Sequence, residues 1–265
     1  MNKSILKKLP ALLAILVMAG GVQTFTSCSS DDEGGGDGSS SSGGGSPSSS
    51  SLQTQGGGSS SSVGGDSGGG TCDANFRTVP IGTQTWMAEN LNCNVNGSRC
   101  YASNPANCAK YGRLYNWSTA MGLPSSCNEN ICSSQINSKH KGICPEGWHL
   151  PTNEEWDKLF RFVDGDTGTE SPYESKTAGK YLKATTGWNE DGNGTDQYGF
   201  SALPGGLVFV GGSFGVGEYG NWWSTSEFEG NKDYAYSRSM DYELDYAEWN
   251  GEDKIAFFSV RCVMD

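Results

Sequence analysis

Oxygen-bearing side chains recur at short spacing in the stretch Glu-Asp-Gly-Asn-Gly-Thr-Asp, which runs from residue 190 to residue 196. Carboxylate and amide oxygens alternate there with glycines that allow sharp turns, and calcium binds shells of about 6–8 oxygen ligands. Glu190, Asp191, Asn193 and Asp196 are therefore a candidate Ca²⁺ site, although not an EF-hand, because the glycine and the terminal glutamate are misplaced. The alternative is a metal-free loop, since Asp, Asn and Gly are also ordinary turn residues.

Aromatic residues are dense in the late part of the chain, and they are Phe214, Tyr219, Trp222, Trp223, Tyr242, Tyr246 and Trp249. Aromatic faces beside carboxylates can stack on sugar rings, or they can form a protein-binding hot spot. We take Trp222, Trp223 and Tyr219, with Asp196, as candidate ligand-binding residues. If the segment is a strand, one tryptophan should face outward and the other inward. The alternative is that both serve the fold, with one buried and one half covered.

Three patterns that could indicate catalysis do not hold. Residues 211–215 match the Gly-x-Ser-x-Gly nucleophile elbow, but no histidine follows Ser213, as that fold requires. Residues 215–220 match a dinucleotide-binding glycine pattern, but Asn-Trp-Trp-Ser follows instead of a helix inside a βαβ unit. Cys144 near His149 could be a thiol nucleophile, but a disulfide-bonded sulfur is not nucleophilic. We therefore predict no catalytic residues.

The N-terminal segment indicates export. Three lysines precede the apolar run at residues 12–17, which predicts a signal peptide at residues 1–27 and is too short to span a membrane. Small residues before Cys28 resemble a bacterial lipobox, which implies lipidation of Cys28. The acidic residues 29–33 resemble a surface-export signal, or are a solvated charge run. Residues 28–71, rich in Gly and Ser, cannot bury a core and predict a flexible tether before a domain at residues 72–265.

Nine cysteines include Cys28 and eight others. An even number of cysteines in an exported domain predicts disulfides. Zinc is disfavoured because no Cys-x-x-Cys occurs and the chain has only two histidines. The expected pairs are Cys100–Cys108, Cys127–Cys132, Cys144–Cys262 and Cys72–Cys93, the last formed by the two cysteines left over.

Charge excludes one class of partner. Residues 72–265 carry −10 of the formal charge of −12, because residues 1–71 hold three lysines and five acids. Nucleic-acid binding depends on Lys and Arg that displace counterions from phosphates. The domain is therefore not expected to bind nucleic acid.

The elements that must position the candidate residues follow from the apolar pattern. Thr152 and Glu155 form a capping box before apolar residues at helical spacing, from Trp156 to Val163. Further helices are expected near residues 114–121 and 176–183, and extended segments at 76–81 and 84–88. Stapled loops should occupy residues 92–110 and 125–143. Strands are expected at residues 200–210, 221–228, 233–240, 242–249 and 255–263. Early helices and late strands predict an α+β fold with a twisted antiparallel sheet, rich in loops.

Several segments together resemble the Fibrobacter succinogenes major paralogous domain family. They are Gly-Trp-His-Leu-Pro-Thr-Asn-Glu-Glu-Trp at 147–156, and the family-like stretches at 81–91, 111–117, 194–206, 223–227 and 259–262. The Leu-Pro-Thr-x-x-Glu-Trp core is also similar to the superfamily of the formylglycine-generating enzyme and the C-type lectins. That similarity implies a C-type-lectin-like fold.

These observations lead to an expected function. We expect a non-catalytic binding or adhesion lipoprotein, tethered through a lipid anchor only and displayed at the surface of the outer membrane. Its partner would be a polysaccharide or a surface protein, and we expect a monomer. The alternatives are an enzyme of the formylglycine-generating type and a purely structural cell-envelope protein.

Overall fold

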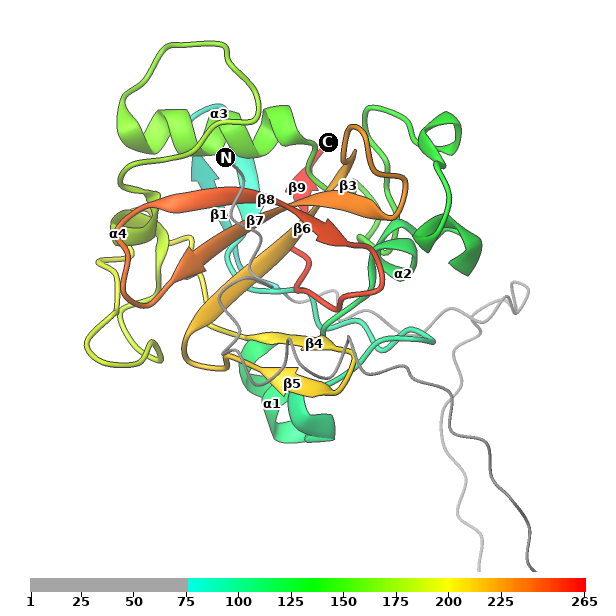
Figure 1. Ribbon diagram of the computed structural model, residues 1–265. Helices are drawn as coiled ribbons and strands as arrows, with labels where there is room; N and C mark the ends of the chain where they lie inside the picture. The colour runs from blue at the N-terminus through cyan, green and yellow to red at the C-terminus, as the bar shows by residue number, and fades with distance from the viewer. Residues whose placement is uncertain (1–75) are drawn as a thin grey trace, which may run out of the picture. The chain divides into compact units, whose positions relative to one another are not determined.

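The computed structural model describes residues 76–265 as short helices and antiparallel strands (Figure 1). The helices are α1 (Pro105–Tyr111), α2 (Trp117–Met121), α3 (Asn153–Asp164) and α4 (Ala178–Leu182), with 3-10 turns η2 (Tyr101–Ser103), η3 (Ser125–Asn128) and η4 (Ser133–Gln135). The predicted signal peptide, Cys28, the tether and Cys72 lie outside the described residues. No helix within residues 76–265 is long and apolar enough to cross a membrane.

The strands of residues 76–265 form three small antiparallel sheets. The first has the order β1-β2-β9-β3, the second β4-β5 and the third β6-β7-β8. Their bounds are β1 (Thr78–Ile81), β2 (Gln84–Met87), β3 (Trp148–His149), β4 (Leu207–Phe209), β5 (Gly212–Phe214), β6 (Tyr219–Glu227), β7 (Tyr234–Asp241), β8 (Ala247–Asp253) and β9 (Val263–Met264). In Figure 1, α3 lies along one side of the third sheet and the β4-β5 hairpin along the other.

Three predicted strands are wrong over most of their length. Residues 255–263 contribute only the start of β9, because residues 257–259 make single bridges to three separate segments instead of one ladder. The strand predicted at 242–249 begins at Ala247, because Asp241 accepts the backbone N–H of Glu243 and turns the chain. The strand predicted at 200–210 is confined to β4.

Helix starts were predictable where a capping side chain precedes proline or acids. The capping box of α3 is present, with the Thr152 hydroxyl accepting the N–H of Glu155 and the Glu155 carboxylate accepting the N–H of Thr152. Helix α1 contradicts the loop predicted at residues 92–110. Asn104 caps it and Pro105 occupies its first turn, which are both favourable helix-start signals.

Three disulfides lie within the described residues, and they are Cys100–Cys108, Cys127–Cys132 and Cys144–Cys262. The pairs Cys100–Cys108 and Cys127–Cys132 staple the two loops in which the sequence placed them. Cys144–Cys262, with a sequence separation of 118, ties the turn before β3 to the segment that enters β9. Cys93 is also disulfide-bonded, and its predicted partner Cys72 lies outside the described residues.

Strand β6 runs between two hydrophobic cores, so both of its tryptophans are buried. Trp222 packs with Trp156 on one face, whereas Trp223 packs on Phe258 on the other, and both indoles are 0% exposed. The prediction that the pair alternates across the strand is confirmed. The prediction that one of them faces outward is wrong, because helix α3 covers one face of the strand and the segment that contains Phe258 covers the other.

His149 in β3 joins Glu155 of α3 to Asp265, which follows β9. Its ring is 1% exposed, and its two nitrogens lie 2.8 Å from Glu155 Oε1 and 2.7 Å from Asp265 Oδ1. Burial opposes the charged ring, but the hydrogen bonds to Glu155 and Asp265 outweigh burial and raise the pKa of His149. Burial likewise opposes the charged form of Glu155, but His149 and the Thr152 N–H lower the pKa of that carboxyl.

These opposite shifts predict a pH window for stability. The contribution of His149 is complete below its ordinary pKa of 6.5 and is lost as pH rises through the raised value. The contribution of Glu155 is complete above its ordinary pKa of 4.5 and is lost as pH falls through the lowered value. The free energy of unfolding should be measured in urea from acid to alkaline pH. The loss in His149→Gln relative to wild type should be largest between the ordinary pKa values of 4.5 and 6.5. Asp265→Asn should lose less unfolding free energy than His149→Gln. Parallel plots of unfolding free energy against pH for wild type and His149→Gln would show that His149 does not cause the pH dependence.

Candidate binding surface

Three of the four candidate calcium ligands, Glu190, Asp191 and Asn193, line one hollow, and Asp196 does not. Asn193 Oδ1 accepts the Trp188 N–H at 3.0 Å, and the Asp196 carboxylate accepts both the N–H and the hydroxyl of Ser201 at 2.6 Å. Glu190 and Asp191 are exposed and have positive φ. Within residues 76–265, no group of three or more His, Cys, Asp or Glu side chains is placed to hold a metal ion. Asn193 and Asp196 therefore use their side-chain oxygens to hold the backbone of neighbouring loop residues.

Three of the four predicted ligand-binding residues are parts of the scaffold. Trp222 and Trp223 are core residues, and Asp196 holds the turn at Ser201. The half-buried ring of Tyr219 lies against Gly215, where an added Cβ would come within 2.3 Å of it. Cys144, the one thiol considered as a nucleophile, is bonded to Cys262.

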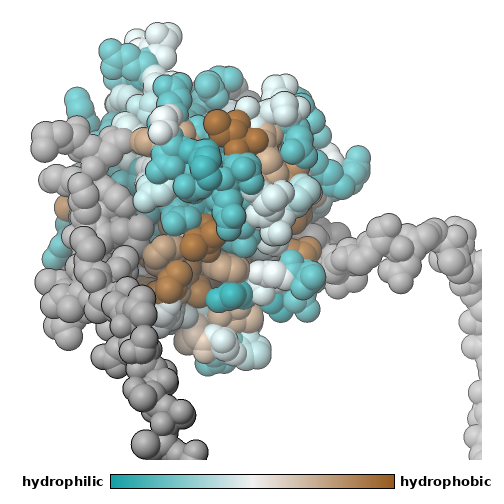
Figure 2. Space-filling model, turned by 45° about the vertical axis from the view of Figure 1, so that its right-hand side comes forward, coloured by the Kyte–Doolittle hydropathy of each residue, from teal (hydrophilic) through white to brown (hydrophobic). Residues whose placement is uncertain are grey.

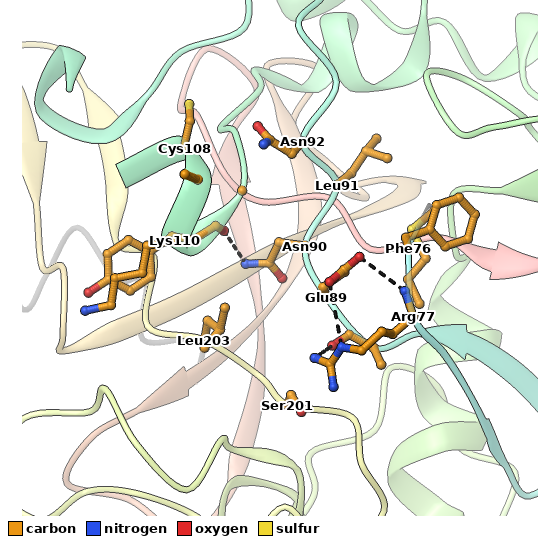
Figure 3. A pocket seen from close by; sticks show the side chains of 15 residues that line it. Phe76, Arg77, Glu89, Asn90, Leu91, Asn92, Cys108, Lys110, Ser201 and Leu203 are labelled. Atoms are coloured by element: carbon orange, nitrogen blue, oxygen red, sulfur yellow. Dashed lines mark hydrogen bonds and ion pairs between the residues drawn. The ribbon is translucent and has the colours of Figure 1, made fainter. Parts of the chain in front are cut away.

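A polar hollow of about 290 Å³ lies between the segment after β2 and helix α1 (Figure 3). Two of its three charged lining residues, Arg77 and Glu89, face each other at 3.8 Å, and the third is Lys110. Its central amide, Asn90, is 5% exposed and is fully used. Asn90 Nδ2 donates to the Tyr111 carbonyl and the Ser259 hydroxyl, and its Oδ1 accepts from Trp222 Nε1 and Arg261 Nη2. The hollow is therefore the edge of a structural junction.

Arg261 is the buried cation of this junction, since it donates to Asn90. Its side chain is 0% exposed, lies over the ring of Phe200 at 4.2 Å and donates to the carbonyls of Phe200 and Ser201. Burial lowers the pKa of Arg261 to about 9, and no described carboxylate forms a salt bridge with it. Carbonyl oxygens and ring faces thus hold the cation, a use of Arg that depends on its planar, weakly hydrated guanidinium.

A group of surface aromatic residues lies on the third sheet: Phe228 follows β6, Tyr234 and Tyr236 are at the start of β7, and Trp249 is near the start of β8. We call Phe228, Tyr234, Tyr236 and Trp249 the aromatic platform, and each of these side chains is half-buried. The ring centroids of Phe228 and Tyr236 are 4.9 Å apart, those of Tyr236 and Trp249 5.7 Å, and those of Phe228 and Tyr234 6.4 Å. The rings therefore form a continuous row from Tyr234 through Phe228 and Tyr236 to Trp249.

The register of the sheet places this row on one face. Tyr236 lies opposite Gly251, and Arg238 opposite Trp249, so these side chains point to the same side. Gly251 leaves space for the ring of Phe228, because an added Cβ would come within 2.4 Å of Phe228 Cδ2. The small residue in β8 is thus the reason that Phe228 can pack beside Tyr236, with the two ring planes 51° apart.

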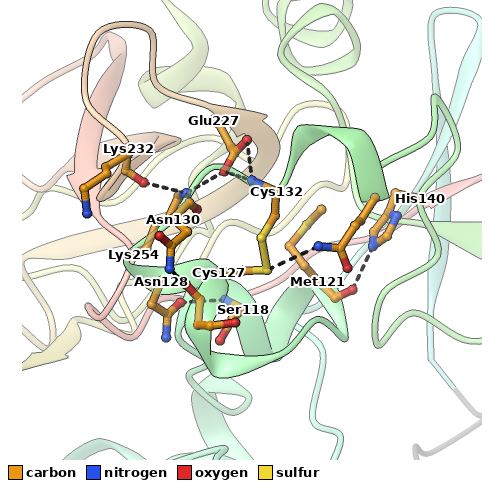
Figure 4. The surroundings of a disulfide bond; sticks show 12 residues. Ser118, Met121, Cys127, Asn128, Asn130, Cys132, His140, Glu227, Lys232 and Lys254 are labelled. Carbon is orange, nitrogen blue, oxygen red and sulfur yellow. Dashed lines mark hydrogen bonds and ion pairs between the residues drawn. A yellow bond between two sulfur atoms is a disulfide. The ribbon is translucent and has the colours of Figure 1, made fainter.

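A buried ion pair fixes the backbone next to Phe228 (Figure 4). Lys254 is 0% exposed, and its Nζ donates to Glu227 Oε1 at 2.6 Å and to the carbonyls of Lys232 and Asn130. The same Glu227 carboxylate accepts the backbone N–H of Cys132 at 2.9 and 3.1 Å. The Cys127–Cys132 loop is thereby held against the residue that precedes Phe228.

A second buried cation supports the platform from the helix side. Arg238 is 0% exposed, and its Nη2 donates to Asp157 Oδ1 of α3 at 2.8 Å. Its Nη1 donates to Asn153 Oδ1 at 3.1 Å. Burial lowers the pKa of Arg238, and Asp157 opposes that effect. Tyr236 and Trp249 are neighbours of Arg238 on the same face of the sheet, so both rings lie beside a residue that is fixed to the N-terminal half of α3.

Acidic residues surround the platform. Glu229 follows Phe228 and is exposed, Asp233 precedes Tyr234, and Asp253 lies directly opposite Tyr234 in the ladder. Burial and the charges of Asp253 and neighbouring acids raise the pKa of Tyr234. Burial and the nearby Asp233 also raise the pKa of Asp253. The rings are therefore bordered by negative charge.

Other exposed apolar side chains are scattered. The face in Figure 2 shows small apolar patches between polar ones. Val210, 70% exposed, and Ile255, 37% exposed, flank a hollow of about 520 Å³ beside the β4-β5 hairpin. Isolated exposed aliphatic residues are common on soluble proteins and need no functional explanation. The platform differs from these patches because its rings contact one another and are bordered by acids.

The sequence contains patterns that indicate the platform, but of its four residues only Trp249 belongs to the late aromatic residues considered as ligand-binding candidates. Tyr234 and Tyr236 alternate with Ala235 and Ser237, a period of two that marks one face of a strand. Gly251, alone in the interior of a strand, is a signal for close approach by another group. Sequence density instead drew attention to Trp222 and Trp223, which are buried.

These features define a disulfide-bonded α+β domain in which two large cores lie on either side of β6, with no group of three or more His, Cys, Asp or Glu side chains placed to hold a metal ion within residues 76–265. The chain belongs to the family described as the Fibrobacter succinogenes major domain, whose family model matches residues 79–264. Searches of curated proteins and of solved structures returned no match to this chain.

The Asn90 junction yields a stability prediction. Asn90→Ala should lower the free energy of unfolding by about 3–5 kcal/mol, because it strands the Trp222 indole N–H, one Arg261 donor and the Tyr111 carbonyl in the interior. Urea denaturation measures the loss. Asn92→Ala, at an exposed position two residues away, is the matched control and should change the same quantity by less than about 0.5 kcal/mol. Equal effects from the two substitutions would show that the junction is not structural.

Proposed function

We propose that this domain is a non-catalytic binding module that recognises carbohydrate through the aromatic platform. The single observation that carries the proposal is the row of contacting, half-exposed rings on Phe228, Tyr236 and Trp249. Large aromatic side chains ordinarily serve cores first, as Trp222 and Trp223 do here. Rings that remain accessible and in contact provide a rigid apolar surface on which the apolar faces of sugar rings can stack.

The surroundings of the platform fit the same ligand class. Sugar rings combine apolar C–H faces with hydroxyl groups that donate hydrogen bonds. Ionised carboxylates accept such bonds, and Glu229, Asp233 and Asp253 lie beside the rings. The buried pairs Lys254–Glu227 and Arg238–Asp157 hold the backbone beneath them, so little ordering should be required on binding.

The same proposal includes the tether and the fold class. We infer that Cys28 is lipidated, that residues 28–71 separate the domain from the membrane, and that the domain is displayed at the surface of the outer membrane as a monomer. A C-type-lectin-like architecture is also part of the proposal. It is supported by the Leu-Pro-Thr-x-x-Glu-Trp stretch, the two stapled loops and the long-range disulfide to Cys262.

Polysaccharide binding should depend on the platform. Trp249→Ala should weaken binding to a retained polysaccharide at least about thirtyfold, the effect of a hot-spot residue worth about 2 kcal/mol. The measurement is affinity electrophoresis of the purified domain against a panel of plant and bacterial polysaccharides, followed by titration calorimetry. The change in unfolding free energy should be at most about 1 kcal/mol, because Trp249 is only half-buried.

Two controls separate binding from folding. Phe162→Ala removes another exposed ring, 49% accessible and located on α3, and should leave affinity unchanged. Trp222→Ala should cost about 3–5 kcal/mol of stability, because it empties part of the core. If no polysaccharide is retained, or if Trp249→Ala binds as wild type does, carbohydrate recognition by the platform is rejected. Retention of a surface protein instead of glycans would assign the platform to protein binding.

Display of the domain depends on Cys28. A non-penetrating protease should remove the domain from intact cells, and Cys28→Ala should release the protein from the membrane fraction or leave it inside the cell. Immunoblotting of shaved cells and of fractions measures both results, and permeabilised cells show that the domain itself is cleavable. Survival of the wild-type domain on intact cells would reject surface display.

A further inference from the structure

We propose that the aromatic platform selects glycans that carry free amino groups, such as glucosamine polymers, over neutral or N-acetylated ones. This inference rests on the proposed function and specifies its ligand class. It depends on the combination of two features in one place, namely accessible ring faces and carboxylates that border them. Each feature alone would fit any sugar, but the two together fit an ammonium group.

The ring faces supply the first half of the argument. The π face of an aromatic ring is negative, and a cation within about 6 Å of its centroid is attracted to it. Phe228, Tyr236 and Trp249 present three such rings in one row, with neighbouring centroids 4.9 and 5.7 Å apart. No cation–π contact is formed with these three rings by the described lysines and arginines, whose contacts of this kind involve other rings.

The charges at the border supply the second half. Glu229 is exposed at the end of the row, and Asp233 and Asp253 flank Tyr234. Lys232 pairs with Asp233 at 2.9 Å, and its side chain is 56% exposed. The two other nearby cations are committed elsewhere, since Arg238 is paired with Asp157 and Lys254 with Glu227, all within the interior. The accessible border is therefore predominantly negative.

Crowding of the carboxylates points the same way. Burial and the charge of Asp233 both raise the pKa of Asp253, so bringing a positive group near them would relieve repulsion that exists in the unliganded protein. An ammonium on a sugar ring could approach Asp253 while the apolar face of the same ring rests on Tyr236, because Gly251, which lies opposite Tyr236, is two residues from Asp253 in β8. A neutral hydroxyl or an acetamido group at that position would gain much less from the same charges.

The test compares three oligomers of equal length, made of glucosamine, N-acetylglucosamine and glucose, by titration calorimetry at a pH where the amine is protonated. The glucosamine oligomer should bind at least about tenfold tighter than the other two at low salt. Raising the salt from about 0.05 M to about 0.5 M should remove most of that preference, because exposed charges are screened. Glu229→Gln and Asp253→Asn should lower the ratio of the affinity for the glucosamine oligomer to that for the glucose oligomer, because an amide keeps an acceptor oxygen for sugar hydroxyls but loses the negative charge.

The controls distinguish the failure of this inference from the failure of the proposed function. Asp191→Asn, an exposed acid in another loop at a backbone conformation that Asn tolerates, should keep the wild-type preference. Equal affinity for the glucosamine and glucose oligomers, both lost in Trp249→Ala, would overturn the amine preference and leave carbohydrate recognition standing. An oligolysine peptide that binds more tightly than the glucosamine oligomer would overturn the inference in favour of a basic protein segment. Binding of none of these probes would overturn it as well, and the polysaccharide panel would then decide the broader proposal.

Discussion

The side-chain amide of Asn90 is the constraint on which most of this structure depends. Its four hydrogen bonds reach the Tyr111 carbonyl, the Ser259 hydroxyl, the Trp222 indole and the Arg261 guanidinium, which come from segments far apart in the chain. An amide has two donor hydrogens and one oxygen with two lone pairs, and all four are used here. Aspartate could not donate, and leucine could not bond at all. The junction therefore demands one residue type, and its failure would leave several buried polar groups without partners.

Because the Asn90 junction holds Trp222 from one side, strand β6 is fixed between two cores. Trp222 bonds to Asn90 Oδ1 through its indole N–H, and Trp223 bonds to the Tyr115 carbonyl, both at 2.8 Å. Each indole thus has its polar atom satisfied by a different segment, which lets a strand carry two adjacent tryptophans, one to each core. The consequence for function is direct. The two adjacent tryptophans are buried in the two cores, and the contacting, half-buried rings lie elsewhere on the third sheet.

Prediction from sequence succeeded where a local signal determines the structure. The Thr152–Glu155 capping box and the two short-range disulfides depend on residues a few positions apart, and both are present. It failed where tertiary contacts decide. Residues 255–263 have strand-like composition, but their backbone bonds to Tyr115, Val208 and Asn221 in turn, so no ladder forms. The two-sided burial of β6 was equally invisible, because alternation indicates opposite faces but not whether each face is covered. The platform needed the register of β7 and β8, which no local pattern specifies.

Two buried cations connect the scaffold to the proposed binding surface, and they do so without adding charge to it. Lys254 and Arg238 are each 0% exposed and each paired with a carboxylate. Replacing such a pair with apolar residues is often neutral or stabilising, so stability alone does not explain their presence. These ion pairs fix the position of the backbone next to the rings. Glu227 binds Lys254 and the Cys132 N–H at once, which fixes the end of β6 at the residue before Phe228. Arg238 lies on β7, two residues after Tyr236 and opposite Trp249, and its ion pair with Asp157 joins this strand to α3. Both positive charges are neutralised inside the fold, so the acids at the surface are left to set the electrostatic potential over the rings. A surface that is aromatic, bordered by negative charge and held by buried ion pairs therefore follows from where the protein places its cations.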